Sequence, residues 1–179
     1  MPEARLNLGC GENIAAGWVN CDRRPLPGLD VCCDVLSALP FESGRFTGIA
    51  AIHLLQDLEY GAIAPCLAEL RRILAAGGTL RLAVPDVDRA ITAYQQRDAA
   101  YFYVGDADAR SIGAKFVTQL VWYGSVRTPC NYEFLAECLT AAGFAEVRRC
   151  RFGETASGDA ALATLDNRPR ESLFVEARR

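Results

Sequence analysis

The sequence contains very few of the side chains on which metal and nucleic-acid binding usually depend. Its 179 residues include one histidine, His53, and one lysine, Lys115. None of the eight cysteines belongs to a Cys-x-x-Cys pair, and the adjacent Cys32 and Cys33 fall in a predicted strand, where neighbouring side chains point to opposite faces. These features argue against a metal site, and we expect buried, reduced cysteines in a cytoplasmic protein.

Long apolar runs and basic clusters are also missing. Hydrophobic residues make up 51% of the chain, yet no uninterrupted apolar run approaches the roughly 20 residues that a membrane-spanning helix needs. Residues 1–5 lack the basic and apolar regions of a signal peptide. The net charge is −3 and the arginines are interspersed with acidic residues. We therefore expect one domain over residues 1–179, with no membrane insertion and no nucleic-acid partner.

What the chain does contain is an alternation of short apolar strands with helical patterns. The expected strands are 5–8, 17–22, 30–34, 48–52, 79–84, 146–152 and 172–178. Helical periodicity predicts helices over 63–74, near 87–103, near 111–121 and from an N-cap at Asn131 to Ala142, with Gly77-Gly78 as a helix stop. Near-continuous apolar strands separated by helices predict an α/β fold with a mainly parallel sheet.

The connections after the first two strands are unusually short. Residues 9–17 and 23–29 leave too little room for the helix of a full crossover, which needs roughly 10–12 residues or more. One face of the sheet over the first three strands would then lack helices. We expect the aromatic segment 86–128 to cover the sheet by folding back over that face, or to cover the acceptor site. A homodimer is expected to bury any remaining apolar surface.

Glycine or polar residues follow four strands in succession. The carboxyl ends of parallel strands form the ligand-binding edge of an open sheet, so these residues are predicted to line one site. They are Gly9 and Gly11 after the first strand, Asp22 after the second, Asp34 after the third and His53 after the fourth. The Asp22 carboxylate is placed to accept ribose hydroxyls, and Asp34 is placed to flank a purine.

Two patterns that are missing narrow the choice of nucleotide. A dinucleotide-binding fingerprint has a third glycine where Ile14 stands, and its acidic residue follows about 20 residues later, whereas Asp22 comes soon after Gly11. A phosphate-binding loop ending in Gly-Lys-Ser/Thr is absent. S-adenosylmethionine, which has ribose and adenine but no phosphate, therefore fits better than a nicotinamide dinucleotide. A nicotinamide-dependent oxidoreductase is the less favoured alternative.

Several segments resemble Rossmann-type S-adenosylmethionine-dependent methyltransferases. They are LNLGCG (6–11), GWVNCD (17–22), LDVCCDVLSALPF (29–41), GIAAIHLLQDL (48–58), LRRILAAGGTLRLAVPD (70–86) and RESLFVEA (170–177). The chain looks most similar to small, largely uncharacterised bacterial members linked to polysaccharide or envelope biosynthesis. The resemblance implies a single-domain, Rossmann-like fold with a seven-stranded, mainly parallel sheet and one antiparallel strand near the C-terminus.

The resemblance also implies roles for individual residues in a cofactor site. Gly9, Cys10 and Gly11 would surround the methionine part of S-adenosylmethionine. Asp22 would bind the ribose, and Asp34 and Val35 would bind the adenine. The remaining cofactor-site residues would be Asn7, Arg23 and His53. Family members usually have an apolar residue where this chain has Arg23. Its guanidinium group could stack on the adenine instead.

One segment departs from the family pattern. Members often carry His-x-x-Glu-His after the fourth strand, and here the glutamate is Gln56 and the second histidine is Asp57. His53 and Asp57 are the candidate catalytic residues, acting as base or acceptor anchor. The implied reaction is O- or N-methylation of a small-molecule or saccharide acceptor.

The altered segment also supports a second hypothesis. The protein would then be a catalytically degenerate module that binds S-adenosylmethionine and has a regulatory or assembly role. Aromatic side chains are candidates for an acceptor pocket or for core, namely Tyr94, Tyr101, Trp122 and Tyr123.

Overall fold

The sheet has the predicted architecture. The computed structural model describes residues 4–179. Residues 1–5, which were judged not to resemble a signal peptide, therefore lie partly outside the described residues. Seven strands form one sheet in the order β3-β2-β1-β4-β5-β7-β6, parallel except for β7, which is antiparallel to β5 and β6. The strands are β1 Arg5–Leu8, β2 Val19–Asp22, β3 Val31–Cys32, β4 Phe46–Ile52, β5 Leu74–Pro85, β6 Ala145–Cys150 and β7 Ser172–Arg178. The α/β fold with one antiparallel strand near the C-terminus is thereby confirmed.

The helices follow the predicted order with changed ends. They are α1 Tyr60–Ile73, α2 Val87–Gln95, α3 Ile112–Val121, α4 Tyr132–Ala141 and α5 Ala160–Ala163, with short 3₁₀ turns η1 Leu55–Asp57, η2 Ala99–Tyr101 and η3 Trp122–Gly124. Asn131 caps α4 as predicted, because its side-chain oxygen accepts from the Phe134 N–H. Helix α2 is shorter than predicted. Between residues 4 and 179 no helix combines the length and the apolar character required to cross a membrane.

The predicted helix stop at Gly77-Gly78 is wrong. Helix α1 ends at Ile73, and both glycines lie inside β5. A Cβ atom on Gly78 would lie 2.9 Å from the carbonyl oxygens of Ala75 and Thr47. Gly78 therefore permits the close approach of β4 to the start of β5, and neither glycine ends the helix.

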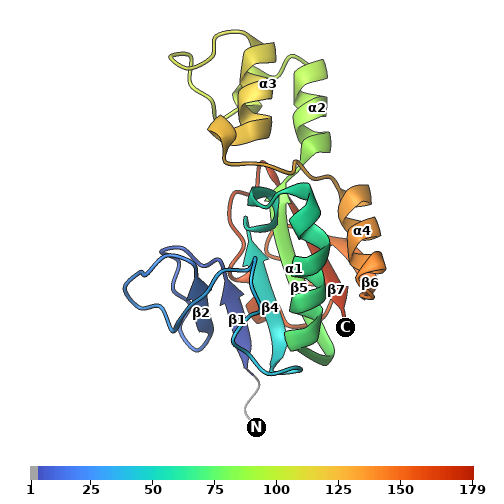
Figure 1. Ribbon diagram of the computed structural model, residues 1–179. Helices are drawn as coiled ribbons and strands as arrows, with labels where there is room; N and C mark the ends of the chain where they lie inside the picture. The colour runs from blue at the N-terminus through green and yellow to red at the C-terminus, as the bar shows by residue number, and fades with distance from the viewer. Residues whose placement is uncertain (1–3) are drawn as a thin grey trace.

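Helices α1 and α4 cover one face of the sheet (Figure 1). Leu6, Ile49 and Leu80 lie side by side in register on this face and are fully buried. The apolar side chains that α1 packs against the sheet are Ile63, Cys66, Leu67, Leu70 and Ile73. Burial of this apolar surface stabilises the fold by roughly 25 cal/mol per Å².

The opposite face carries a row of polar side chains. Register places Asn20, Asn7, Ala50, Arg81 and Glu176 side by side across five neighbouring strands, and all are buried. The Asn7 amide donates to the Asn20 side-chain oxygen at 3.0 Å and to a carbonyl of the short β1–β2 connection at 2.8 Å. This face over the first strands is therefore polar and bonded to its own connections, so it does not need a covering helix.

An ion-pair network fixes the rest of that face. The fully buried Arg81 guanidinium donates to Asp166 at 2.7 and 2.5 Å and to Glu176 at 2.7 Å. Glu176 also accepts from the backbone N–H groups of Ala156 and Ser157, both at 2.9 Å. These bonds hold the β6–β7 connection (residues 151–171) across the sheet.

The aromatic segment does not fold back over the first three strands. Residues 87–124, called the helical lobe from here on, stand beyond the carboxyl ends of the strands (Figure 1). The lobe has its own small core, formed by Ala90, Ala93, Tyr101 and Phe102 with Ile112, Phe116 and Leu120 packed against them. The only lysine, Lys115, is buried there and donates to the Val104 carbonyl at 2.6 Å. Tyr101, Phe102 and Phe116 are thus used in the core of the lobe itself.

The prediction of reduced cysteines is wrong for one pair. Cys21 and Cys33 form a disulfide, whereas Cys32 is exposed. Strands β2 and β3 are neighbours with Cys21 opposite Val31, so the side chain of Cys33, two residues on, reaches the same face. The opposite orientation of Cys32 and Cys33 is confirmed. The expectation of a cytoplasmic protein loses the support that reduced cysteines gave it.

Replacing Arg81 should test the ion-pair network. We expect Arg81→Met to lower the free energy of unfolding by about 3–5 kcal/mol, because Asp166 and Glu176 are left buried without a cation. Urea unfolding followed by circular dichroism measures the change. Arg148→Met is the control: Arg148 lies opposite Glu176 in the register, but its side chain is 63% exposed, so the expected change is within about 0.5 kcal/mol. Equal losses in the two variants would contradict this role for Arg81.

Candidate functional site

The glycine turn after β1 depends on two residues with positive φ. Gly9 has φ +66° and Gly11 has φ +54°, a region that favours glycine. The N–H groups of Gly9 and Cys10 donate to the Cys21 carbonyl at 2.7 and 3.1 Å, which joins the turn to β2. A Cβ atom on Gly9 would lie 2.2 Å from Cδ1 of Leu54. The segment after β4 can close on the turn only because residue 9 is glycine.

Asp22, at the end of β2, is bonded directly to this turn. Its Oδ2 accepts from the Gly11 N–H at 2.9 Å, and its Oδ1 accepts from the Arg24 N–H at 2.9 Å and from Arg24 Nε at 3.2 Å. Burial alone would raise the pKa of Asp22, but these hydrogen bonds from Arg24 and Gly11 lower it below its usual range. The structure therefore places a buried, ionised carboxylate at the predicted ribose position.

The other predicted cofactor residues differ in their surroundings. Asp34 follows β3 and is exposed, and its Oδ1 accepts from the Leu36 N–H at 2.9 Å. Val35 is half-buried against the main core, and Arg23 is exposed. Cys10 is buried, and burial followed by the nearby Asp22 charge raises the pKa of its thiol.

Asn7 is buried in β1, two residues before Gly9. Its side chain belongs to the polar row on the opposite face of the sheet, where its amide bonds to the β1–β2 connection. The role of Asn7 in the cofactor site stays a prediction.

His53 follows β4 with φ +56° and bonds through Nε2 to Ser172 Oγ at 2.9 Å. Ser172 Oγ also lies 3.3 Å from the Asn167 carbonyl oxygen. The Nδ1 atom of His53 is buried without a partner among residues 4–179. Burial, and then the positive charge of Arg168, lowers the pKa of His53 to about 4.

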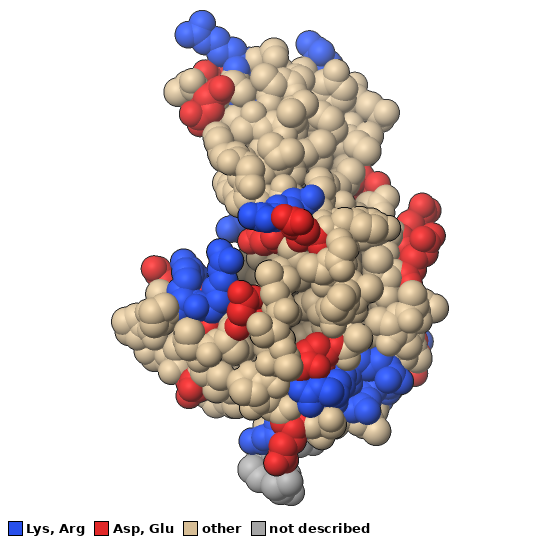
Figure 2. All heavy atoms as spheres, viewed as in Figure 1, with Lys and Arg blue, Asp and Glu red and all other residues tan. Residues whose placement is uncertain are grey.

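A pocket of about 210 Å³ opens beside His53, where the ends of β4 and β5 meet the helical lobe. This strand-end pocket is lined by His53, Gln56, Asp57, Pro85, Gln119, Trp122, Ser125, Val126, Arg168 and Glu171. Both predicted catalytic residues, His53 and Asp57, thus line one pocket. Figure 2 shows the surface hollowed between the helical lobe and the body of the protein, with charged side chains of both signs near the hollow.

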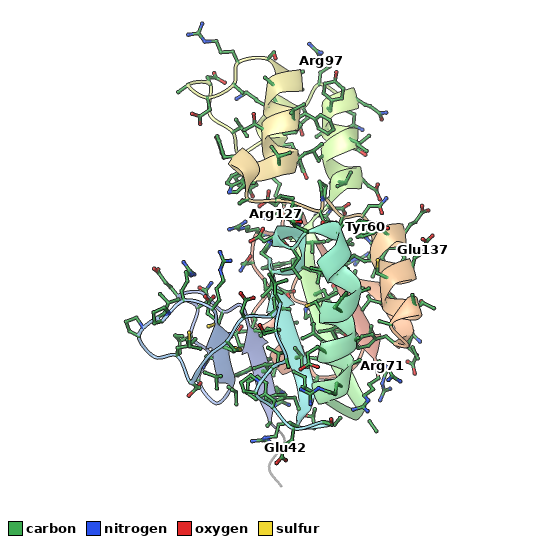
Figure 3. The ribbon with its side chains drawn as sticks, viewed as in Figure 1. Glu42, Tyr60, Arg71, Arg97, Arg127 and Glu137 are labelled. Carbon is green, nitrogen blue, oxygen red and sulfur yellow. A yellow bond between two sulfur atoms is a disulfide. The ribbon has the colours of Figure 1, made fainter. Side chains whose placement is uncertain are left out.

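Gln56 connects the pocket to the lobe. Its side-chain Nε2 donates to Asp57 Oδ1 at 3.1 Å, while its buried Oε1 has no partner within the described part of the chain. Its backbone carbonyl accepts from the N–H groups of Arg127 and Thr128 at 2.9 and 3.0 Å. Arg127 lies at the junction of lobe and body (Figure 3) and pairs with Glu59 at 2.7 Å. These contacts fix the segment that returns from the lobe against η1.

Of the four aromatic candidates for an acceptor pocket, one lines the strand-end pocket. Trp122 does so, whereas Tyr101 is in the core of the lobe and Tyr94 stacks on Phe116 with ring centroids 5.0 Å apart. The exposed Tyr123 bonds to Asp108.

Sequence reasoning missed Arg168 and Glu171, which reach the pocket from the β6–β7 connection. Arg168 stands in a stretch without periodicity or motif. Glu171 falls in the segment RESLFVEA (170–177), for which the resemblance implied no residue role.

The described residues contain no group of three or more histidine, cysteine or acidic side chains arranged to hold a metal ion.

The sequence matches no family model and no curated protein sequence. Solved structures do match it over almost its whole length. One is an S-adenosylmethionine-dependent methyltransferase from Archaeoglobus fulgidus, 12% identical with a TM-score of 0.64, covering 99% of this chain and 86% of that chain.

Two further structures show the same likeness. One is a possible histamine N-methyltransferase from Thermotoga maritima, 14% identical with a TM-score of 0.61, covering 99% of this chain and 83% of that chain. The other is a Burkholderia thailandensis 1,6-didemethyltoxoflavin-N1-methyltransferase with bound S-adenosylhomocysteine, 17% identical with a TM-score of 0.58, covering 99% of this chain and 71% of that chain. The chain has the α/β fold of S-adenosylmethionine-dependent methyltransferases.

The lowered pKa of His53 should appear in the pH dependence of stability. The folded protein keeps this ring neutral down to about pH 4, whereas the unfolded chain protonates it near its ordinary pKa of 6.5. The unfolded state therefore binds more protons between these values, and stability falls as the pH falls through this window. The contribution lost is at most about 3 kcal/mol.

Urea unfolding of wild type and His53→Gln at about pH 7 and about pH 4.5 measures this difference. We expect the wild type to lose more stability on acidification than the variant does. Parallel losses in both proteins would show that His53 titrates normally in the folded state.

Proposed function

We propose that this protein transfers the methyl group of S-adenosylmethionine to an oxygen or nitrogen of a small-molecule or saccharide acceptor. One observation carries the proposal. The buried Asp22 carboxylate is bonded to the glycine turn after β1, and the strand-end pocket opens beside the end of β4. Strands β1 and β4 flank the point at which the strand order reverses, where ligands of open α/β sheets bind.

The residues at this edge suit the proposed cofactor. Asp22 is ionised, and its partner Arg24 has a side chain that is 58% exposed, so the guanidinium can move into solvent and release the carboxylate to ribose hydroxyls. Asp34 and Val35 follow the next strand outward and would flank the adenine, with Arg23 stacking on it. The turn from Gly9 to Gly11 would surround the methionine part.

S-adenosylmethionine supplies an electrophilic sulfonium methyl group. The residues of this chain must hold the lone pair of the acceptor about 3–3.5 Å from that methyl group and exclude water. His53 lines the pocket, where its neutral imidazole would lie beside the reacting O–H or N–H group. Because its pKa is lowered to about 4, His53 is a weak base, which favours a role in orienting the acceptor. Asp57 lines the same pocket and is the candidate for receiving the released proton.

A second candidate function is a degenerate module that binds S-adenosylmethionine for regulation or assembly. The observation that favours it is the pairing of Gln56 with Asp57, where related proteins often have glutamate and histidine. A nicotinamide-dependent oxidoreductase has less support, because the antiparallel β7 between β5 and β6 departs from the parallel strand order of dinucleotide-binding sheets.

Cofactor binding can be tested at Asp22. We expect Asp22→Asn to weaken S-adenosylhomocysteine binding by about 1.5–3 kcal/mol, the usual contribution of a hydrogen bond to a charged group. Isothermal titration calorimetry measures the affinity, and circular dichroism checks the fold. Glu137→Gln on the exposed surface of α4 is the matched control and should bind like wild type. An unchanged affinity in a folded Asp22→Asn protein would reject the ribose assignment.

The role of His53 in turnover can be tested once an acceptor is identified. His53→Ala should reduce the rate of methyl transfer by about 10²-fold and leave S-adenosylhomocysteine affinity within about threefold of wild type. Transfer of a radiolabelled methyl group measures the rate. Equal losses of rate and affinity would instead place His53 in the cofactor site or in the core. A protein that binds the cofactor but methylates no acceptor would favour the degenerate module.

A further inference from the structure

The Arg24 side chain extends from Asp22 to the glycine turn after β1. Its Nε donates to Asp22 Oδ1 at 3.2 Å, and a Cβ atom on Gly11 would lie 3.3 Å from its Nη2. Its charge also acts on the turn itself. Burial and then the Asp22 charge raise the pKa of the Cys10 thiol, whereas the Arg24 charge lowers it. Contacts with three neighbours thus place one guanidinium group beside the turn.

We propose that Arg24 binds the carboxylate in the methionine part of S-adenosylmethionine, and that its guanidinium exchanges the Asp22 carboxylate for this one when the cofactor enters. The inference rests on the proposed function. It adds a binding residue to the same cofactor site and gives that residue a part in selecting the ligand.

The bond between the Arg24 side chain and Asp22 can be exchanged. The side chain is 58% exposed, and Nε supplies its one hydrogen bond within residues 4–179. Four of the five guanidinium N–H groups are therefore available to a ligand. Because an exposed ion pair contributes little to stability, the guanidinium can leave Asp22 at small cost.

Asp22 stays ionised after such an exchange. Burial raises its pKa, but the backbone N–H groups of Arg24 and Gly11 each donate to it at 2.9 Å and lower the pKa more than the Arg24 side chain does. Neither backbone bond depends on the position of the guanidinium. Asp22 can therefore accept the ribose hydroxyls, while the bonded backbone of Arg24 keeps its side chain within reach of the turn.

The charges of the cofactor favour this partner. The methionine part carries a carboxylate and an ammonium group, and the carboxylate is the only anionic group of S-adenosylmethionine. A guanidinium group can form two parallel hydrogen bonds with a carboxylate, and it repels an ammonium group. Arg24 would therefore determine which end of the amino-acid part lies beside it, and would favour the cofactor over adenosine derivatives that lack a carboxylate.

The preceding residue, Arg23, acts on a different part of the site. Burial raises the pKa of Asp57, and the Arg23 charge is among those that lower it. Asp57 lines the strand-end pocket, whereas Asp22 and Cys10, on which the Arg24 charge acts, belong to the glycine-turn region. The sequence alone gives no reason to prefer one of these adjacent arginines for the carboxylate, and the contacts select Arg24.

Isothermal titration calorimetry on the full chain can compare two ligands that differ only in the carboxylate. They are S-adenosylhomocysteine and S-adenosyl-3-thiopropylamine, which is the same molecule without that group. We expect the wild type to bind S-adenosylhomocysteine about tenfold or more tighter, and Arg24→Gln to lower this affinity ratio by about tenfold. Equal affinity of the wild type for the two ligands, or an unchanged ratio in Arg24→Gln, would overturn the inference.

Arg110→Gln is the matched control, because it removes the same charge from an exposed position in the helical lobe. Its affinity ratio should equal that of the wild type. An equally lowered ratio in Arg110→Gln would reject a specific contact with Arg24. Circular dichroism checks the fold of both variants. If Arg24→Gln does not fold, the wild-type ratio decides the question, since it needs no variant.

The inference and the proposed function fail in different ways. If Arg24→Gln binds both ligands more tightly by the same factor, Arg24 only competes with the ribose for Asp22. The carboxylate assignment is then wrong and the cofactor assignment stands. A wild-type protein that binds neither ligand would reject the proposed function and this inference together.

Discussion

The pairing of the Arg81 guanidinium with Asp166 and Glu176 determines how the second face of the sheet is covered. Burying three charged groups costs several kcal/mol for each ion, and only close pairing with further hydrogen bonds offsets that cost. Glu176 is in β7, but Asp166 comes from the β6–β7 connection, so the pairing requires this connection to lie flat on the sheet. The β6–β7 connection, which has no long helix, thereby covers this face, whereas helices α1 and α4 cover the other.

The strand-end pocket depends on the same packing. The connection that Arg81 holds ends in Arg168 and Glu171, which line the pocket, and leads directly into Ser172, which orients His53. The helical lobe supplies the remaining wall and is attached through the backbone carbonyl of Gln56. The candidate site is therefore assembled from three segments that are far apart in the sequence, and none of them forms it alone.

Features encoded by neighbouring residues were predictable from the sequence, and features set by pairing between strands were not. Strand alternation, the glycine turn before Asp22 and the Asn131 cap are local, and the structure contains each of them. The polar row through Asn7 and Asn20 requires the register of the sheet, which no local pattern gives. The Cys21–Cys33 disulfide likewise requires knowing that β2 and β3 are neighbours. The lobe stands apart from the sheet because its aromatic side chains form a small core of their own. The aromatic composition alone fits such a core and a cover for the sheet equally well.

The use of arginine for all but one of the basic residues has a consequence for alkaline solutions. Burial alone would lower the pKa of Arg81, but its hydrogen bonds and ion pairs with Asp166 and Glu176 raise it further above an already high value. A guanidinium group keeps its proton in proteins, whereas a lysine in the same position would begin to lose its charge near pH 10. The buried network therefore keeps its cation in alkaline solutions in which a lysine at this position would become neutral.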